Sequence, residues 1–219
     1  MRRLSALALA ASSPLAVLGF AGQAQAHPHV FAEARLEVTL NPDETVKSLR
    51  HVWRFDDVFS ATVVMEFDKN GDLKLDDAEM ADVSKTIFES LGEYGYFQVV
   101  TADGKDVAMK PPAPFVAQYQ DDRLIVLFES EPAQPLKLRG KLDFGIYDPS
   151  FYTAIDFTDD KELVVENLPH RCTHAVIRPD PDEAIAQNQA TLTEAFFNDP
   201  SGTDMSKIFA TRLELNCAA

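Results

Sequence analysis

The acidic stretch from Asp68 to Glu79 carries the residues whose types and spacing point most clearly to chemistry. A hard cation such as Ca²⁺ takes six to eight oxygen ligands, and a tightly coiled loop turns alternate side chains toward one centre. Oxygen donors occupy positions 1, 3, 5, 7, 9 and 12 of this twelve-residue window. They are Asp68, Asn70, Asp72, the backbone carbonyl of Lys74, Asp76 and Glu79. The pattern predicts a calcium site that Glu79 closes with both carboxylate oxygens.

This spacing resembles the calcium loop of an EF-hand, with one departure. Position 6, where such loops carry glycine, is Leu73. The turn at that position favours a positive φ, which costs a residue with a Cβ roughly 1 kcal/mol or more. We therefore expect modest affinity, with a dissociation constant of about 10⁻⁴–10⁻³ M, as in extracellular calcium modules. The alternative is an acidic surface turn that binds no ion.

The segments on either side of the loop must position it, and both are periodic. Apolar residues recur at helical spacing before and after the acidic stretch, which predicts an EF-hand-like helix–loop–helix at about 55–91. They are Val58, Phe59, Thr62, Val63 and Phe67 upstream, and Met80, Val83, Ile87, Phe88 and Leu91 downstream. No second loop has the spacing, so the rest of the domain must cover the apolar helix faces.

Residues 1–26 have the pattern of a secretory signal peptide, with Arg2 and Arg3 before an apolar run and an A-x-A site at Ala24–Ala26. We expect one periplasmic domain at 27–219, with no segment apolar enough to span a membrane. Without residues 1–26 the chain has 18 basic and 35 acidic residues. That balance argues against nucleic acid and anionic membranes as partners and suits a protein that meets cations.

The expected mature chain starts His27-Pro28-His29. A free amine and two imidazoles can bind Zn²⁺, Ni²⁺, Co²⁺ or Cu²⁺. Pro28 lacks an N–H, so the four-nitrogen N-terminal copper and nickel chelate cannot form, and further ligands are needed. If Leu40 and Thr45 flank the first hairpin turn, Asp56 or Asp57 lies near His29. The alternative is a frayed N-terminus.

Cys172 and Cys217 are the two cysteines of the chain. In an oxidising compartment such a pair forms a disulfide, worth roughly 4 kcal/mol for a loop of this length. The alternative is a metal site that also uses His170 and His174.

The remaining sequence favours an α+β fold with a mostly antiparallel, sandwich-like β body, the inserted helix–loop–helix and a C-terminal helix. In the first strands Leu36, Val38 and Leu40 alternate with polar residues, and His51 shares a face with Trp53, which favours a packed core histidine. Strands are predicted at 35–40, 46–55, 97–101, 105–109, 115–120, 123–130, 136–145, 151–157, 162–166 and 173–177. A helix is predicted from Asp182 to about Phe197, and a short helical turn at 205–210.

Catalytic patterns are absent from the sequence. It has no G-x-S-x-G, G-x-x-x-x-G-K-[ST], G-x-G-x-x-G or H-E-x-x-H motif, and neither cysteine has the context of a free nucleophile. We therefore expect a protein that is not an enzyme.

Three segments together resemble a bacterial family. They are the signal peptide followed by His27–Phe31, the insertion with Asp68–Asp72, and Tyr147-Asp148-Pro149. The chain is similar to a family of unknown function described as periplasmic components of an uncharacterised ABC-type transport system. The resemblance implies association with a membrane metal transporter for nickel, cobalt or zinc, and it supplies no catalytic residue.

Three hypotheses remain. In the first, the protein is a periplasmic metal-binding accessory of metal-ion transport, with a calcium loop and an N-terminal histidine site. In the second, it is a structural or interaction protein in which calcium only stabilises the fold. In the third, it is a copper enzyme built on His27.

Overall fold

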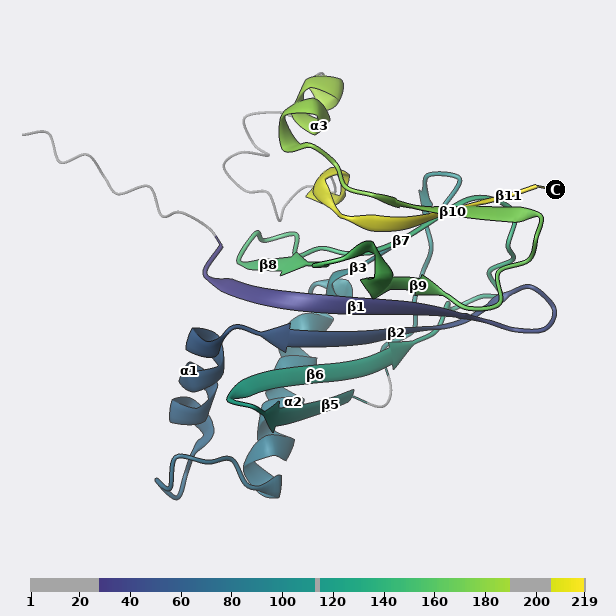
Figure 1. Ribbon diagram of the computed structural model, residues 1–219. Coiled ribbons are helices and arrows are strands. Elements are labelled where there is room, and N and C mark those ends of the chain that lie inside the picture. Colours follow the sequence, from purple (N-terminus) through teal and green to yellow (C-terminus); the bar gives the residue numbers. More distant parts are fainter. Residues whose placement is uncertain (1–27, 113–114, 190–205, 219) are drawn as a thin grey trace, which may run out of the picture.

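A computed structural model describes residues 28–112, 115–189 and 206–218, which form two β-sheets and a helical arm at 57–92 (Figure 1). The strands are β1 (Val30–Leu40), β2 (Val46–Phe55), β3 (Gln98–Ala102), β4 (Lys105–Asp106), β5 (Phe115–Gln120), β6 (Arg123–Ser130), β7 (Gly140–Ile146), β8 (Thr153–Asp156), β9 (Leu163–Val165), β10 (Cys172–Ile177) and β11 (Arg212–Cys217). The α-helices are α1 (Asp57–Phe67), α2 (Asp77–Gly92) and α3 (Pro181–Asn188). Short 3₁₀ helices span Gly95–Phe97, Asp160–Glu162 and Ser206–Phe209.

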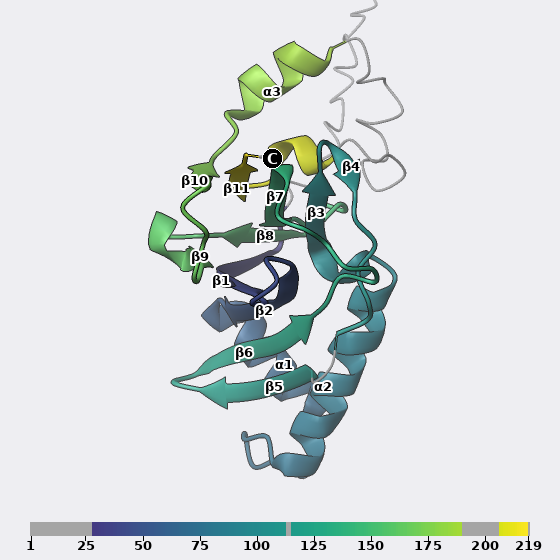
Figure 2. The same cartoon turned by 90° about the vertical axis from the view of Figure 1, so that its right-hand side faces the viewer.

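The first sheet has the order β5-β6-β2-β1-β8, with β9 also paired to β1, and the second has the order β10-β11-β7-β3-β4. Among the strands of the described residues, only β8 and β9 pair in parallel, both with β1, and the other strand pairs are antiparallel. The α+β class with a mostly antiparallel body is therefore confirmed. Figure 2 shows α1 and α2 beside β5 and β6, at the end of the first sheet away from β8.

Alternation along the strands explains the core. Every second residue of β1 is buried, and its other side chains face outward, where Arg54 pairs with Glu33 and Arg50 with Glu37. The inward side chains of both sheets form one apolar cluster. Its largest members include Leu36, Leu49, Trp53, Leu124, Leu142, Phe144, Ile146, Leu213 and Leu215.

The turn between β1 and β2 differs from the predicted one. Ala32 pairs with Phe55, and the register shifts between Thr39 and Leu40, so Leu40 pairs with Val46 rather than flanking the turn with Thr45. Thr45 is held inside the turn instead, because its hydroxyl donates to the Asp43 carboxylate at 2.6 Å. The predicted hairpin is correct, but its register was wrong by about two residues.

The C-terminal region also differs from the prediction, because its last element is a strand. The predicted helix from Asp182 corresponds to α3, and residues 190–205 lie outside the described part of the chain. Sequence reasoning missed β11, although Leu213, Leu215 and Cys217 alternate with polar residues and are buried. It lies between β10 and β7, so the second sheet depends on it.

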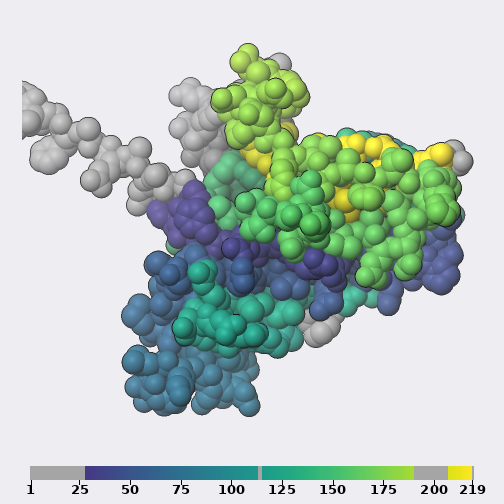
Figure 3. Space-filling model, in the orientation of Figure 1, coloured from purple at the N-terminus to yellow at the C-terminus, as the bar shows by residue number. Residues whose placement is uncertain are grey.

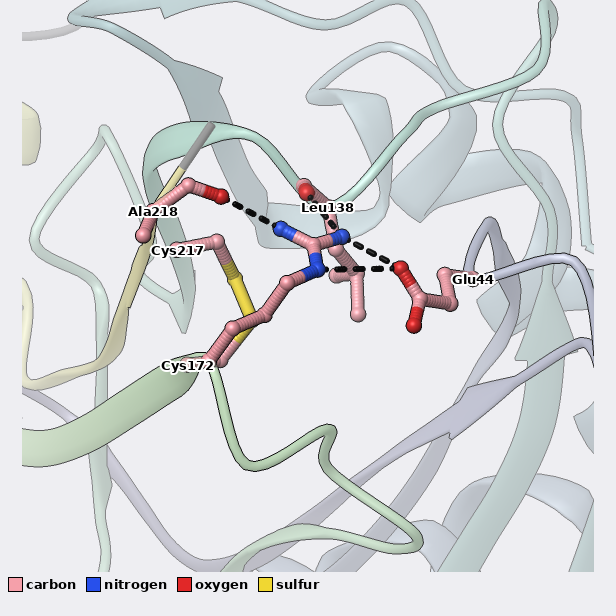
Figure 4. Close-up of a disulfide and its surroundings, with 6 residues drawn as sticks. Glu44, Leu138, Cys172, Cys217 and Ala218 are labelled. Atoms are coloured by element: carbon pink, nitrogen blue, oxygen red, sulfur yellow. Dashed lines mark hydrogen bonds and ion pairs between the residues drawn. A yellow bond between two sulfur atoms is a disulfide. The ribbon is translucent and has the colours of Figure 1, made fainter.

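The predicted disulfide between Cys172 and Cys217 is present and joins directly paired positions of β10 and β11, with a Cα–Cα distance of 4.1 Å. Arg171 reinforces this corner (Figure 4). Its guanidinium donates to the carbonyls of Ala218 at 2.6 Å and Leu138 at 2.8 Å and forms an ion pair with Glu44. The alternative Cys/His metal site with His170 and His174 is excluded by the bonded sulfurs.

Two serine hydroxyls attach the helical arm to the first sheet. Ser60 of α1 donates to the Asp56 carbonyl and accepts the N–H of Leu124 on β6 at 2.9 Å. Ser84 of α2 likewise donates to the Met80 carbonyl, and it accepts the N–H of Ala117 on β5 at 3.0 Å. Each hydroxyl satisfies a strand N–H that the ladder leaves without a partner.

Replacing either serine with alanine is expected to destabilise the protein by about 1–3 kcal/mol, because a strand N–H loses its acceptor. Ser60 is fully buried, so Ser60→Ala should have the larger effect. The control is Ser90→Ala, since the exposed Ser90 hydroxyl donates only to the Thr86 carbonyl of its own helix. Urea unfolding measures the difference, and equal losses for all three variants would contradict this role.

Candidate functional site

The loop between α1 and α2 is organised around the Asp68 carboxylate. This side chain accepts the backbone N–H groups of Gly71 at 2.7 Å, Asp72 at 3.3 Å and Leu73 at 2.7 Å. Partial burial raises the pKa of Asp68, but these backbone hydrogen bonds outweigh it and hold the pKa below its usual value. The loop is therefore coiled around an ionised carboxylate at its first position.

Glu79 connects the two ends of the loop. Its side chain is buried, and its two carboxylate oxygens accept the N–H groups of Lys69 at 2.7 Å and Asp76 at 2.9 Å. Asp76 in turn accepts the N–H groups of Ala78 and Glu79, which completes a capping box at the start of α2. Glu79, the last residue of the predicted ligand set, is thus the third residue of α2 and helps to cap the start of that helix.

Leu73 has the backbone conformation that the sixth position of the pattern predicts. Its φ is +62°, in the left-handed region, and 77% of its side chain surface is exposed. A leucine gains nothing from this exposure and carries the steric cost of a Cβ at positive φ. The strain expected from the sequence is confirmed.

The donor chemistry and backbone of this loop fit calcium, whereas its side chains do not converge on one point. Within residues 28–112, 115–189 and 206–218, no three or more His, Cys, Asp or Glu side chains form a group that could hold a metal ion. Asn70 and Asp72 instead accept the N–H groups of Asp72 and Lys74, both at 2.9 Å. These oxygens keep further lone pairs, so the side chains would have to turn inward around an ion. The calcium site stays a prediction.

The predicted transition-metal ligands lie at the start of β1 and of α1. His29 is exposed, its N–H donates to the Tyr152 carbonyl at 2.9 Å, and its ring centroid is 5.2 Å from that of Tyr152. His27 lies outside the described residues. Asp57 is exposed in the first turn of α1.

Asp56 has a structural role. It caps α1 by accepting the N–H of Phe59 at 2.9 Å, and its other oxygen accepts the N–H of Phe31 at 2.8 Å. Partial burial raises the pKa of Asp56, but these hydrogen bonds lower it further than burial raises it. The structure thus places Phe31, rather than His29, beside Asp56 and does not gather His29, Asp56 and Asp57 into a metal-holding group.

Two of the segments on which the family resemblance rests meet in space, which sequence reasoning missed. Pro28 lines a cavity of about 230 Å³ together with Tyr147, Asp148, Phe151 and Phe209. Asp148 is buried and accepts the N–H and hydroxyl of Ser150 and the N–H of Thr153, so its carboxylate fixes this turn. The contact arises because β8 pairs in parallel with β1, and no local pattern marks such a long-range pairing.

A second cavity of about 400 Å³ lies on the second sheet beside α3. Its lining includes Asp143, whose carboxylate is hydrogen-bonded to Thr101 at 3.0 Å and to Arg212 at 3.2 Å. This cluster stabilises the neighbouring strands β3, β7 and β11, and no spacing in the sequence could have identified it.

No helix among the described residues is long and apolar enough to cross a membrane. Comparison with curated proteins finds the "Uncharacterized 15.5 kDa protein in trpE 3'region" of Spirochaeta aurantia. It is 27% identical to this chain over 134 residues, which cover 61% of this chain and 96% of the relative. The family model "Protein of unknown function (DUF1007)" matches residues 13–217. Since that match covers nearly the whole chain, this protein belongs to the DUF1007 family.

Proposed function

We propose that this protein is a periplasmic metal-binding accessory of a metal-ion transport system, and that its loop at 68–79 binds calcium. The observation that carries the calcium part is the loop backbone. Leu73 adopts the left-handed conformation at position 6, and Asp68 at position 1 accepts the three N–H groups that coil the loop. An all-oxygen donor set on such a backbone suits a hard cation.

Calcium would act here as a structural clamp. The loop joins α1 to α2, and the arm is attached to the sheet by Ser60 and Ser84. The Glu79 carboxylate already closes the loop through hydrogen bonds from the N–H groups of Lys69 and Asp76. An ion would have to compete with those hydrogen bonds, which supports modest affinity. A compartment rich in calcium would keep such a loop occupied.

The transport part of the proposal rests on the exported pattern of residues 1–26 and on the resemblance to periplasmic transport components. Its metal site would use His27 and His29 with Zn²⁺, Ni²⁺, Co²⁺ or Cu²⁺. Titration of protein with a native N-terminus at His27 tests it, because a tag before His27 would remove the free amine. Equal affinity for zinc in the wild type and in His29→Ala would contradict the site.

Leu73→Gly is expected to stabilise the folded protein by about 1 kcal/mol, because glycine adopts positive φ without strain. Calcium affinity should stay close to that of the wild type, because the loop already holds position 6 at φ +62°. Calorimetric titration and urea unfolding measure the two effects. The control is Asp122→Gly at an exposed turn with φ +57°, where the same relief of strain should leave calcium affinity unchanged. A Leu73→Gly variant that is no more stable than the wild type would show that the Cβ at position 6 does not strain the loop.

A further inference from the structure

Four exposed apolar residues belong to elements that follow one another along one side of the molecule, from the start of β1 down α1 and into the loop. Phe31 is 55% exposed, Val58 74%, Met65 71% and Leu73 77%. These four side chains, which we call the arm-side patch, make up four of the seven large hydrophobic side chains exposed in the described residues. In Figure 1 the start of β1, α1 and the loop follow one another down the same side, and Figure 3 shows the arm as a projecting lobe.

Helix α1 contributes the centre of the patch. Val58 and Met65 are seven residues apart and so lie on one face of the helix, with the exposed Ala61 between them. The opposite face buries Val63 and Val64 against the protein. A helix that is apolar on both faces is normally covered on both, and here only one face is covered within the described part of the chain.

Phe31 extends the patch beyond the helix. Two hydrogen bonds join its backbone to Asp56, the residue that caps α1. The Phe31 N–H donates to the Asp56 carboxylate, and the Asp56 N–H donates to the Phe31 carbonyl, both at 2.8 Å. The backbone of Phe31 is thereby held beside the first turn of α1. Exposed apolar side chains on adjoining elements of this kind mark an interaction surface.

The charge around the patch selects the kind of partner. Residues 56–79 contain eight Asp or Glu residues and two Lys residues, a net charge of −6. A second copy of this chain would bring the same acidic surface against itself, and an anionic bilayer would be repelled. A complementary partner presents apolar residues together with Lys or Arg.

We propose that the arm-side patch docks a basic amphipathic segment of another protein, with apolar side chains on Val58 and Met65 and with Lys or Arg toward the surrounding carboxylates. This inference goes beyond the proposed calcium function and does not depend on it. The membrane transporter of the proposed function is one protein that could supply such a segment.

The test is a calorimetric titration of the protein, in chelator, with an amphipathic helical peptide of about 18 residues that has leucine on one face and lysine on the other. We expect binding that weakens by about tenfold or more in Val58→Ser/Met65→Gln, since each lost apolar contact lowers affinity several-fold. The matched control is Val116→Ser, since Val116 is 38% exposed on β5 and does not belong to the arm-side patch. A photo-crosslinker at position 65, but not at 116, should capture the peptide.

Equal peptide affinity in the wild type and the double variant would overturn the proposal, because binding would then reflect charge alone. Absence of peptide binding would overturn it as well. Dimerisation of the wild type that the double variant loses, or flotation with anionic phosphatidylglycerol vesicles, would assign the patch to a different occupant. The use of chelator keeps these outcomes separate from any failure of the loop to bind calcium.

Discussion

Lowering the pH from 6.5 to 5 is expected to reduce the free energy of unfolding by roughly 2 kcal/mol through His51 alone. His51 is fully buried between the sheets, its ring stacks on Phe128 at 4.3 Å, and neither ring nitrogen completes a hydrogen bond with a described residue. Burial lowers its pKa from 6.5 to about 3, and Gln98 offsets only part of that shift. Below pH 6.5 the unfolded chain therefore gains a proton that the folded chain does not bind, so stability falls toward pH 3.

His51→Leu isolates this effect, because it keeps the apolar contacts and removes the titrating group. Urea unfolding at pH 7, 6 and 5 should show the loss in the wild type and its absence in His51→Leu. Carboxylates with lowered pKa values, such as Glu214 beside Lys141, contribute at lower pH, below the ordinary Glu value of 4.5. The control His174→Gln, at an exposed position on β10, should retain the wild-type slope. The same slope in His51→Leu would mean that another group governs acid stability.

Removal of the disulfide is the second large effect. Replacing Cys172 and Cys217 with alanine should cost about 4 kcal/mol in the entropic model for a sequence separation of 45 residues, and lower the melting temperature by about 10 °C. The bond fixes the end of β11, an interior strand of the second sheet, so its loss should loosen β10 and β11 first.

Thermal melting with and without dithiothreitol measures this effect. Reductant should lower the melting temperature of the wild type to that of the double variant and should leave the double variant unchanged. A wild type that shows two free thiols after reduction but melts at the same temperature would contradict the expected contribution.

Local patterns predicted most of the fold. Alternation identified β1 and β2, helical spacing identified α1 and α2, and the two cysteines identified the disulfide. The pairings and strands that sequence reasoning missed depend on contacts between distant segments. No turn in the sequence marks the parallel pairing of β8 with β1. Sequence reasoning missed β11 because a short alternating stretch forms a strand only through its pairing with the neighbouring strands β10 and β7.

In the candidate site too, local spacing predicted some features, and contacts between distant segments determine the others. The loop conformation followed from ligand spacing, since the positive φ of Leu73 and the capping box of Asp76 and Glu79 are set within twelve residues. The environment of His29 did not follow from spacing, because it depends on the hairpin register and on Tyr152, which lies far along the chain. Spacing thus predicts short-range geometry, whereas sites assembled from several strands need the tertiary fold.

Calcium titration of the mature protein tests the central claim most directly, with thermal melting as a second readout. We expect one calcium per chain with a dissociation constant of about 10⁻⁴–10⁻³ M, and a stabilisation of about 1–3 kcal/mol at 10 mM calcium. Asp68→Ala should abolish binding, whereas Asp103→Ala, outside the loop, should bind as the wild type does. No heat of binding and no change in melting temperature at 10 mM calcium would contradict the claim.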